Sequence, residues 1–212
     1  MTITSESTEV DQAVSTGLLP SWESVESLAA AAFERYRGVG DGTVADYIPA
    51  LADADPARFG LSLIETGGLS HDIGDTAHQF SIQSISKAFV YALVRDAFGH
   101  GAVKDRVGVN NTGLPFNSVM ALELNDGHPM NPMVNAGAIA TTALLPGDTS
   151  DDKWETILSG LSAFAGRRLE MDDDVYRSEM RTNARNKALA RLLQSYGRLD
   201  DDPLDMVDVY TR

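Results

Sequence analysis

The pattern of apolar and polar positions predicts a mainly helical chain that contains one β-hairpin. Apolar residues recur at spacings of three and four between residues 22 and 36, as on one face of a helix. Ser21 is a good N-cap residue for this helix, and Gly38 stops it. Apolar residues alternate with small or polar ones from residue 59, and Thr66-Gly67-Gly68 offers a turn. Residues 59–73 are therefore expected to form the hairpin.

The remaining helices are predicted from the same periodicity and from their end residues. The segment 135–145 is small and apolar almost all round, which indicates a buried helix. Gly99 ends one helix, and Pro203 suits the first position of the last one. The predicted helices cover about residues 83–98, 135–145, 152–164, 174–196 and a segment that begins near residue 202.

The first 18 residues are polar, rich in Ser and Thr and without periodicity, and are predicted to form a flexible N-terminal tail. They hold neither the basic nor the apolar segment of a secretory signal, so a cytoplasmic location is expected. No Gly- or Pro-rich linker divides the chain after this tail. Residues 19–212 are therefore expected to belong to a single domain.

Charge and composition exclude several functions. The 212 residues include 17 Lys and Arg against 31 Asp and Glu, a formal net charge of −14. Nucleic acids and anionic membranes need clustered basic residues, so neither is expected as a partner. The sequence has no Cys, and its four His residues lack metal-ligand spacing. No nucleotide-binding glycine motif is present either, so we expect neither a metal nor another cofactor.

A Ser-x-x-Lys motif formed by Ser84 and Lys87 is the strongest candidate for chemistry. At this spacing both side chains lie on one face of the helix predicted at 83–98. A Ser hydroxyl becomes a good nucleophile when a base takes its proton, and burial favours the neutral Lys amine that such a base requires. Ser86 points about 100° away round the helix, and Ser81 precedes its first turn. The alternative is structural: Ser84 caps the helix and Lys87 is exposed to solvent.

Polar side chains on the helix predicted at 174–196 form a second candidate site. Glu179, Asn183 and Asn186 share one face of that helix. A carboxylate and two amides suit the ammonium and carboxylate groups of an amino acid, although a solvated polar face has the same pattern. Asn135 either caps the buried helix or points into a pocket, and capping is the default expectation.

Longer blocks of the sequence resemble the serine-dependent glutaminase family, within the superfamily of β-lactamases and penicillin-binding transpeptidases. The resemblance runs in family order from about residue 44 to the C-terminus. The blocks that carry it are Val44-Ala45-Asp46-Tyr47-Ile48-Pro49-Ala50-Leu51, Phe80-Ser81-Ile82-Gln83-Ser84-Ile85-Ser86-Lys87, Gly113-Leu114-Pro115-Phe116-Asn117-Ser118, Asn131-Pro132-Met133-Val134-Asn135-Ala136-Gly137-Ala138-Ile139 and the helix with Ser178-Glu179 and Ala184-Arg185-Asn186.

This resemblance implies hydrolysis of L-glutamine to L-glutamate and ammonia through an acyl-enzyme. It implies that Ser84 is the nucleophile, that Lys87 is its base, and that the backbone N–H of Ser84 supplies half of an oxyanion hole. Glu179 would pair with the substrate α-ammonium, and Asn and Tyr donors would bind the α-carboxylate. The matching substrate-binding positions are Asn135, Glu179, Asn186 and Tyr210, with Tyr47 and Gln83 close to the same site. A homo-oligomer without cofactor is expected.

The implied fold is an α and β fold of β-lactamase/transpeptidase type, with an antiparallel sheet flanked by helices and a helical subdomain. Members of the family continue beyond the position that matches Arg212, so residues 19–212 are expected to form the N-terminal and helical part of the domain, with an incomplete sheet. A second active-site Tyr, a Lys-Ser-Gly-like strand and the other oxyanion donor would lie in the further part.

Two alternatives to an active glutaminase stay open. One is a catalytically impaired short form that acts as a binding or assembly module. The other is another serine acyl-transfer hydrolase of the same superfamily. The pairing of Glu179 with Asn186 speaks against the second, because most β-lactams present no free α-amino acid group.

Overall fold

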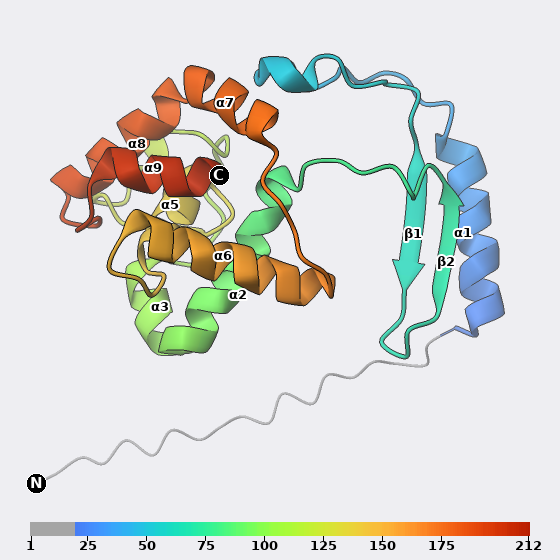
Figure 1. The fold of residues 1–212 in the computed structure, drawn as a ribbon, viewed down its shortest axis with the longest axis horizontal. Helices are drawn as coiled ribbons and strands as arrows, with labels where there is room; N and C mark the ends of the chain where they lie inside the picture. Colours follow the sequence, from blue (N-terminus) through green and yellow to red (C-terminus); the bar gives the residue numbers. More distant parts are fainter. Residues whose placement is uncertain (1–19) are drawn as a thin grey trace, which may run out of the picture. The chain divides into compact units, whose positions relative to one another are not determined.

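The computed structural model describes residues 20–212, and the predicted tail at residues 1–18 lies outside the described residues. The described chain forms two compact units (Figure 1). The first comprises the described residues up to Thr43 together with Pro56–His78, and the second comprises Val44–Asp55 and Gln79–Arg212. That residues 19–212 act as a single domain stays a prediction.

The first unit consists of one helix and the predicted hairpin. Helix α1 (Trp22–Tyr36) begins after Ser21, whose hydroxyl oxygen accepts a hydrogen bond from the backbone N–H of Ser24 at 3.3 Å. Strands β1 (Gly60–Ile64) and β2 (Ser70–Gly74) pair antiparallel. The rings of Phe33 and Phe59 stack at 5.2 Å between centroids and join α1 to the start of β1. The predictions of this helix and of the hairpin are confirmed.

The regular secondary structure of the second unit is helical in its described residues. The helix predicted at 83–98 is confirmed apart from its first turn, which is a 3-10 turn. Two short helices, α3 and α4, were not predicted. The elements are η1 (Pro49–Leu51), η2 (Gln83–Ile85), α2 (Ser86–Phe98), α3 (His100–Arg106), α4 (Met120–Glu123), α5 (Asn135–Ala143), α6 (Ser150–Ala165), α7 (Asp173–Thr182), α8 (Ala184–Ser195) and α9 (Pro203–Thr211).

The prediction of one continuous helix at 174–196 is wrong, because the helix breaks at Asn183. This residue has φ −84° and ψ 23° and separates α7 from α8. Its amide nitrogen contacts the sulfur of Met180 at 3.1 Å, and the Thr182 hydroxyl donates to the Glu179 carbonyl at 3.2 Å. Short polar side chains that bond to their own backbone or neighbours in this way compete with helical hydrogen bonds. Glu179 and Asn186 therefore stand on different helices.

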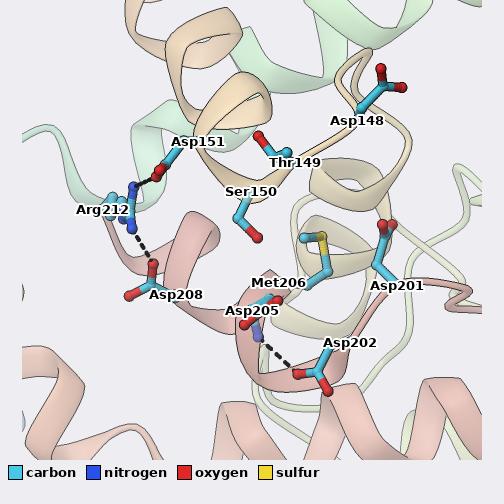
Figure 2. A pocket seen from close by; sticks show the side chains of 10 residues that line it. All are labelled: Asp148, Thr149, Ser150, Asp151, Asp201, Asp202, Asp205, Met206, Asp208 and Arg212. Atoms are coloured by element: carbon cyan, nitrogen blue, oxygen red, sulfur yellow. Dashed lines mark hydrogen bonds and ion pairs between the residues drawn. The ribbon is translucent and has the colours of Figure 1, made fainter.

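Side-chain caps define where two of these helices begin. Thr149 and Asp152 form a capping box at the start of α6, with the Thr149 hydroxyl oxygen accepting from the Asp152 N–H at 3.1 Å. The Asp202 carboxylate accepts from the N–H groups of Leu204 and Asp205 at 2.8 and 3.1 Å and caps α9 (Figure 2). The start of the last helix, with Pro203 at its first position, agrees with the prediction.

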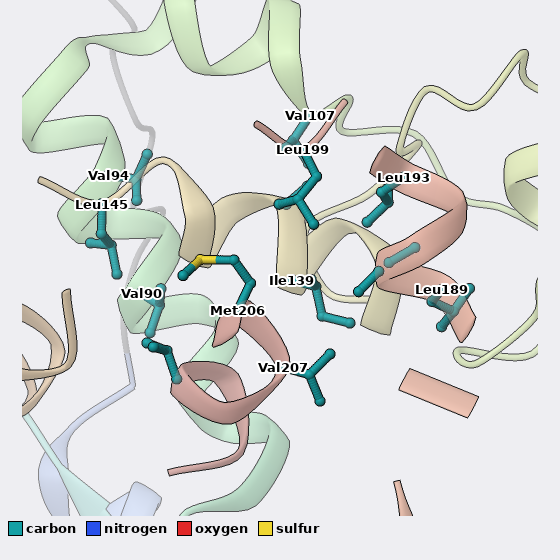
Figure 3. Packing of buried hydrophobic residues seen from close by; sticks show 14 of the residues in the cluster. Val90, Val94, Val107, Ile139, Leu145, Leu189, Leu193, Leu199, Met206 and Val207 are labelled. Atoms are coloured by element: carbon teal, nitrogen blue, oxygen red, sulfur yellow. The ribbon is translucent and has the colours of Figure 1, made fainter. Parts of the chain in front are cut away.

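Helix α5 lies at the centre of the second unit, as its apolar composition predicts. All its residues from Asn135 to Thr142 are buried. Helices α2, α8 and α9 pack against α5, and the α5 residue Ile139 is fully buried in the shared apolar cluster (Figure 3). The buried Lys153 of α6 donates to the Ala143 and Leu145 carbonyls at 2.5 and 3.0 Å, so a cation satisfies the C-terminal end of α5. In the described part of the chain, no helix has both the length and the apolarity to cross a membrane.

Replacing Gly137 of α5 by Ala is expected to lower the free energy of unfolding by about 2 kcal/mol. A Cβ at this position would lie 1.8 Å from the carbonyl oxygen of Asn131 and 2.6 Å from its carbon, and backbone atoms cannot swing aside. Urea unfolding measures the change. Gly101 of α3 is the matched control, because nothing lies within 4 Å of a Cβ there. Gly101→Ala should stabilise by up to about 1 kcal/mol. An unchanged midpoint for Gly137→Ala would contradict this close packing.

Candidate active site

One cavity of about 630 Å³ in the second unit collects most of the predicted site residues. It is bordered by η2 and the segment before it, by α2, α5, α6, α7 and α9, and by the segment that joins α6 to α7. A cavity of this size accommodates a small molecule such as an amino acid. The predicted residues that line it are Gln83, Ser84, Lys87, Glu179 and Tyr210.

The change from a 3-10 turn to an α-helix sets the positions of Ser84 and Lys87. Ser84 is exposed in η2, and Lys87 lies in the first turn of α2. Gln83, just before Ser84, has φ 47°, a left-handed conformation that residues with a Cβ seldom adopt. The Ser86 hydroxyl donates to the Gln83 carbonyl at 2.7 Å and supports this turn. Ser84 and Ser86 both line the cavity, but the Ser86 hydroxyl is engaged in a structural hydrogen bond.

The Lys87 amine is enclosed by polar acceptors and aromatic rings. The residue is only 5% exposed. Its Nζ donates to Asn135 Oδ1 at 2.8 Å and to the Met133 carbonyl at 3.3 Å. The same nitrogen lies 5.8 Å from the ring centroid of Phe116 and 6.0 Å from that of Tyr210. The alternative of a solvent-exposed Lys87 is therefore wrong.

Burial changes the acidity of Lys87 and Glu179, two of the charged residues that line the cavity, in opposite directions. Desolvation lowers the pKa of Lys87 from 10.5 to about 8, and the nearby Glu179 carboxylate partly counteracts this shift. Burial raises the pKa of Glu179, and the Lys87 charge offsets part of this rise. No carboxylate forms a salt bridge with Lys87 among the described residues. The neutral fraction of the Lys87 amine near neutral pH is therefore larger than that of an ordinary lysine.

Asn135 connects Lys87 to two other predicted residues. Its Oδ1 also accepts from the Tyr210 hydroxyl at 3.3 Å, and its Nδ2 donates to Asn186 Oδ1 at 2.8 Å. Asn135 and Asn186 are each 8% exposed and do not line the cavity. The default expectation that Asn135 caps α5 is wrong, because Val134 occupies the N-cap position and makes no side-chain cap. The amide oxygen of Asn135 instead accepts hydrogen bonds from Lys87 and Tyr210, which are both donors.

The two predicted tyrosines occupy different environments. Burial, followed by the charges of Glu179 and Tyr47, raises the pKa of Tyr210. Its hydroxyl therefore stays protonated and can donate hydrogen bonds. Tyr47 is 62% exposed and does not line the cavity. Its segment lies beside α7, because the N–H of Ala50 donates to the Ser178 hydroxyl at 3.1 Å.

Two residues that contact Lys87 were not singled out from the sequence. Phe116 lies in one of the blocks that carry the family resemblance, and this is the sequence signal that could have found it. An aromatic ring of this kind can lie over a lysine ammonium group. Met133 acts through its backbone carbonyl, and no property of a side chain indicates such a contact. The Met133 carbonyl group is positioned by a turn that the Asn131 side chain stabilises. The Asn131 Oδ1 atom accepts a hydrogen bond from the Met133 N–H at 2.7 Å.

A second cavity of about 500 Å³ lies between α6 and α9 and contains none of the predicted site residues (Figure 2). Its lining is acidic, but several of its carboxylates have structural partners. Asp202 caps α9, and Asp151 and Asp208 each accept from the Arg212 guanidinium at 2.8 Å. These carboxylates therefore serve to hold the helices together.

Comparison with known proteins places this geometry in a family. The sequence model of the family described as Glutaminase matches residues 42–212. Glutaminase 2 of Yersinia pestis is 46% identical over 199 residues, which cover 94% of this chain and 58% of that protein. A glutaminase of Brucella canis is 48% identical over 186 residues, which cover 86% of this chain and 59% of that protein.

Solved structures agree with these relatives. A structure described as probable glutaminase ybaS aligns with a TM-score of 0.87 at 38% identity, over 91% of this chain and 62% of that one. Mglu in its tris and glutamate form aligns with a TM-score of 0.79 at 37% identity, over 88% of this chain and 42% of that one. The chain thus spans less than two thirds of the length of each of these proteins.

These matches confirm the expected α and β fold of β-lactamase type. Within residues 20–212, its sheet has the two strands β1 and β2. The family match covers far more than half of the chain and includes every predicted site residue. The chain belongs to the glutaminase family.

Proposed function

We propose that this chain hydrolyses L-glutamine to L-glutamate and ammonia, with Ser84 as the nucleophile and Lys87 as its base. The observation that carries the proposal is the buried Lys87 amine in the same cavity as the exposed Ser84 hydroxyl. Membership of the glutaminase family gives the substrate class. A cytoplasmic location and a homo-oligomeric state stay predictions.

The hydrogen bonds of Lys87 suit a neutral amine. A neutral amine has two N–H groups, and Lys87 has two acceptors, Asn135 Oδ1 and the Met133 carbonyl. Its lone pair is then free to accept the Ser84 hydroxyl proton. No hydrogen bond joins Ser84 to Lys87 within residues 20–212, and catalytic hydrogen bonds commonly shorten only when the substrate binds.

Recognition of the amino-acid end of the substrate is assigned to Glu179 and Tyr210. The Glu179 carboxylate lines the cavity and attracts the α-ammonium group. The Tyr210 hydroxyl, kept protonated by its raised pKa, turns its single proton from Asn135 Oδ1 to the α-carboxylate when the substrate binds. Asn135 and Asn186 support these groups from behind the cavity wall, since Asn135 bonds to both Tyr210 and Asn186. Gln83 lies beside the nucleophile, and Tyr47 lies near Tyr210.

The reaction then follows in two balanced stages. The Ser84 oxygen gives its proton to Lys87 and attacks the side-chain carbonyl carbon of glutamine. The C–N bond breaks as the nitrogen takes the proton from Lys87 and leaves as ammonia, and a γ-glutamyl ester remains on Ser84. Water then gives a proton to Lys87 and attacks the ester carbon. The Ser84 oxygen leaves with that proton, and L-glutamate is released.

Ser84→Ala is expected to lower ammonia release from L-glutamine by roughly a thousand-fold or more, because it removes the proposed nucleophile. The neighbouring Ser81 and Ser86 hydroxyls are engaged in hydrogen bonds with Gln83. A coupled ammonia assay on the 212-residue chain measures this. Ser195→Ala, at an exposed hydroxyl at the end of α8, is the control and should leave the rate unchanged. No ammonia from the unchanged chain, or equal rates with and without the Ser84 hydroxyl, would contradict the proposal.

The kcat/KM for glutamine, which reports the ionisation of the ligand-free chain, is expected to rise with pH and to level off above pH 8. The base must be neutral, and the neutral fraction of an amine with pKa about 8 grows about tenfold per pH unit below that value. The same assay in buffers from pH 6 to 10 measures the profile. A kcat/KM that does not depend on pH between 6 and 8 would count against Lys87 as the base.

The stability of the fold should also depend on Lys87. The folded pKa of about 8 lies below the ordinary 10.5, so between these values the unfolded chain binds more protons than the folded one. The free energy of unfolding, relative to a Lys87→Met variant, is therefore expected to rise with pH, by up to about 1 kcal/mol per pH unit.

Urea unfolding at pH 7, 8, 9 and 10 checks this rise. Lys104→Met, at an exposed lysine of α3, controls for the loss of one positive charge. A constant difference between the unchanged chain and Lys87→Met across this range would show that Lys87 titrates normally.

A further inference from the structure

A hydrogen bond between α7 and α9 lies beside the cavity and is not used by the proposed chemistry. The Tyr176 hydroxyl of α7 donates to the Asp208 carboxylate of α9. Tyr176 stands three residues before Glu179, and Asp208 stands two residues before Tyr210. The bond therefore joins the helix that carries the proposed ammonium-binding carboxylate to the helix that carries the proposed carboxylate-binding hydroxyl.

The Asp208 carboxylate also forms an ion pair with Arg212. This carboxylate accepts from Arg212 Nη2 at 2.8 Å, and Arg212 Nη1 donates to Asp151 of α6 at 2.8 Å (Figure 2). Helix α9 is therefore held by charged groups to α6 as well as by Tyr176 to α7. An acceptor fixed in this way by an ion pair holds the Tyr176 hydroxyl in one place.

Helix α7 packs against η1 on one side and against α9 on another. The break at Asn183 separates α7 from α8, so the α8 helix does not continue into α7 and set its direction. On the side of η1, the Ser178 hydroxyl accepts from the Ala50 N–H at 3.1 Å. On the side of α9, the bond from Tyr176 to Asp208 links the two helices directly and so acts on the separation of Glu179 from Tyr210.

We propose that Tyr176 and Asp208 are positioning residues that set the separation of Glu179 from Tyr210, and through it the selectivity of the cavity for an α-ammonium group. This inference rests on the proposed function, in which Glu179 binds that group. Tyr176 itself also lines the cavity, so its ring stays in the wall when only its hydroxyl is removed.

Binding of L-glutamate and of glutarate, which lacks the α-ammonium group, tests the inference by isothermal titration calorimetry on the 212-residue chain. Neither compound carries the side-chain amide that the proposed reaction cleaves. Tyr176→Phe keeps the ring and removes the bond to Asp208. We expect the preference for L-glutamate over glutarate to fall by about tenfold in this variant, while glutarate binds as before.

Tyr196→Phe is the matched control. The Tyr196 hydroxyl also donates to a carboxylate, that of Glu123 at 2.9 Å, but neither residue lines the cavity. This variant should keep the preference of the unchanged chain. An unchanged preference in Tyr176→Phe, or equal weakening of both ligands, would overturn the inference and leave the proposed function intact. Failure of the unchanged chain to bind L-glutamate would overturn the proposed function and the inference together.

Discussion

The burial of a single ammonium group, that of Lys87, is the constraint on which the rest of this site depends. A buried lysine needs acceptors, and the second unit supplies them from α5 and from the loop before it, through Asn135 Oδ1 and the Met133 carbonyl. The close approach of Gly137 to the Asn131 backbone fixes that loop on α5. The packing of α2 against α5 then brings lysine and acceptors together. Burial costs stability when the amine is charged, and the lowered pKa is the consequence.

Lys87 and Glu179 show how one cavity can hold a base and a binding group for a cation. Burial lowers the pKa of Lys87 and raises that of Glu179, and the charge of each group offsets part of the pKa shift of the other. In the proposed function, the α-ammonium group of the substrate takes over the neutralisation of Glu179. Lys87 then no longer has to be charged to stabilise that carboxylate, so substrate binding itself favours the neutral base. The distance of Glu179 from Lys87 and Tyr210 therefore affects the proposed reaction as well as the affinity for the substrate.

The sequence predicts most helices and the hairpin, because periodicity and caps such as Ser21 and Pro203 act locally. Prediction from the sequence fails where residues far apart in the chain determine the local structure. The break at Asn183 interrupts an otherwise continuous periodic pattern, and the start of α5 resembles an ordinary cap because Asn135 is a common capping residue. The partner that Asn135 has instead, Lys87, is 48 residues away. The bond between Tyr176 and Asp208 spans 32 residues and leaves no motif. The Ser84 and Lys87 pair was found because its two members are neighbours on one turn.

The most direct test of this account is the titration of the Lys87 amine itself. NMR of the chain with isotope-labelled lysine side chains, recorded from pH 6 to 11 and assigned through a Lys87→Met variant, follows this one group. The account predicts a midpoint near pH 8 for Lys87. A midpoint near the ordinary lysine value of 10.5 would show that the amine stays charged at neutral pH, and it would contradict the assignment of Lys87 as the base.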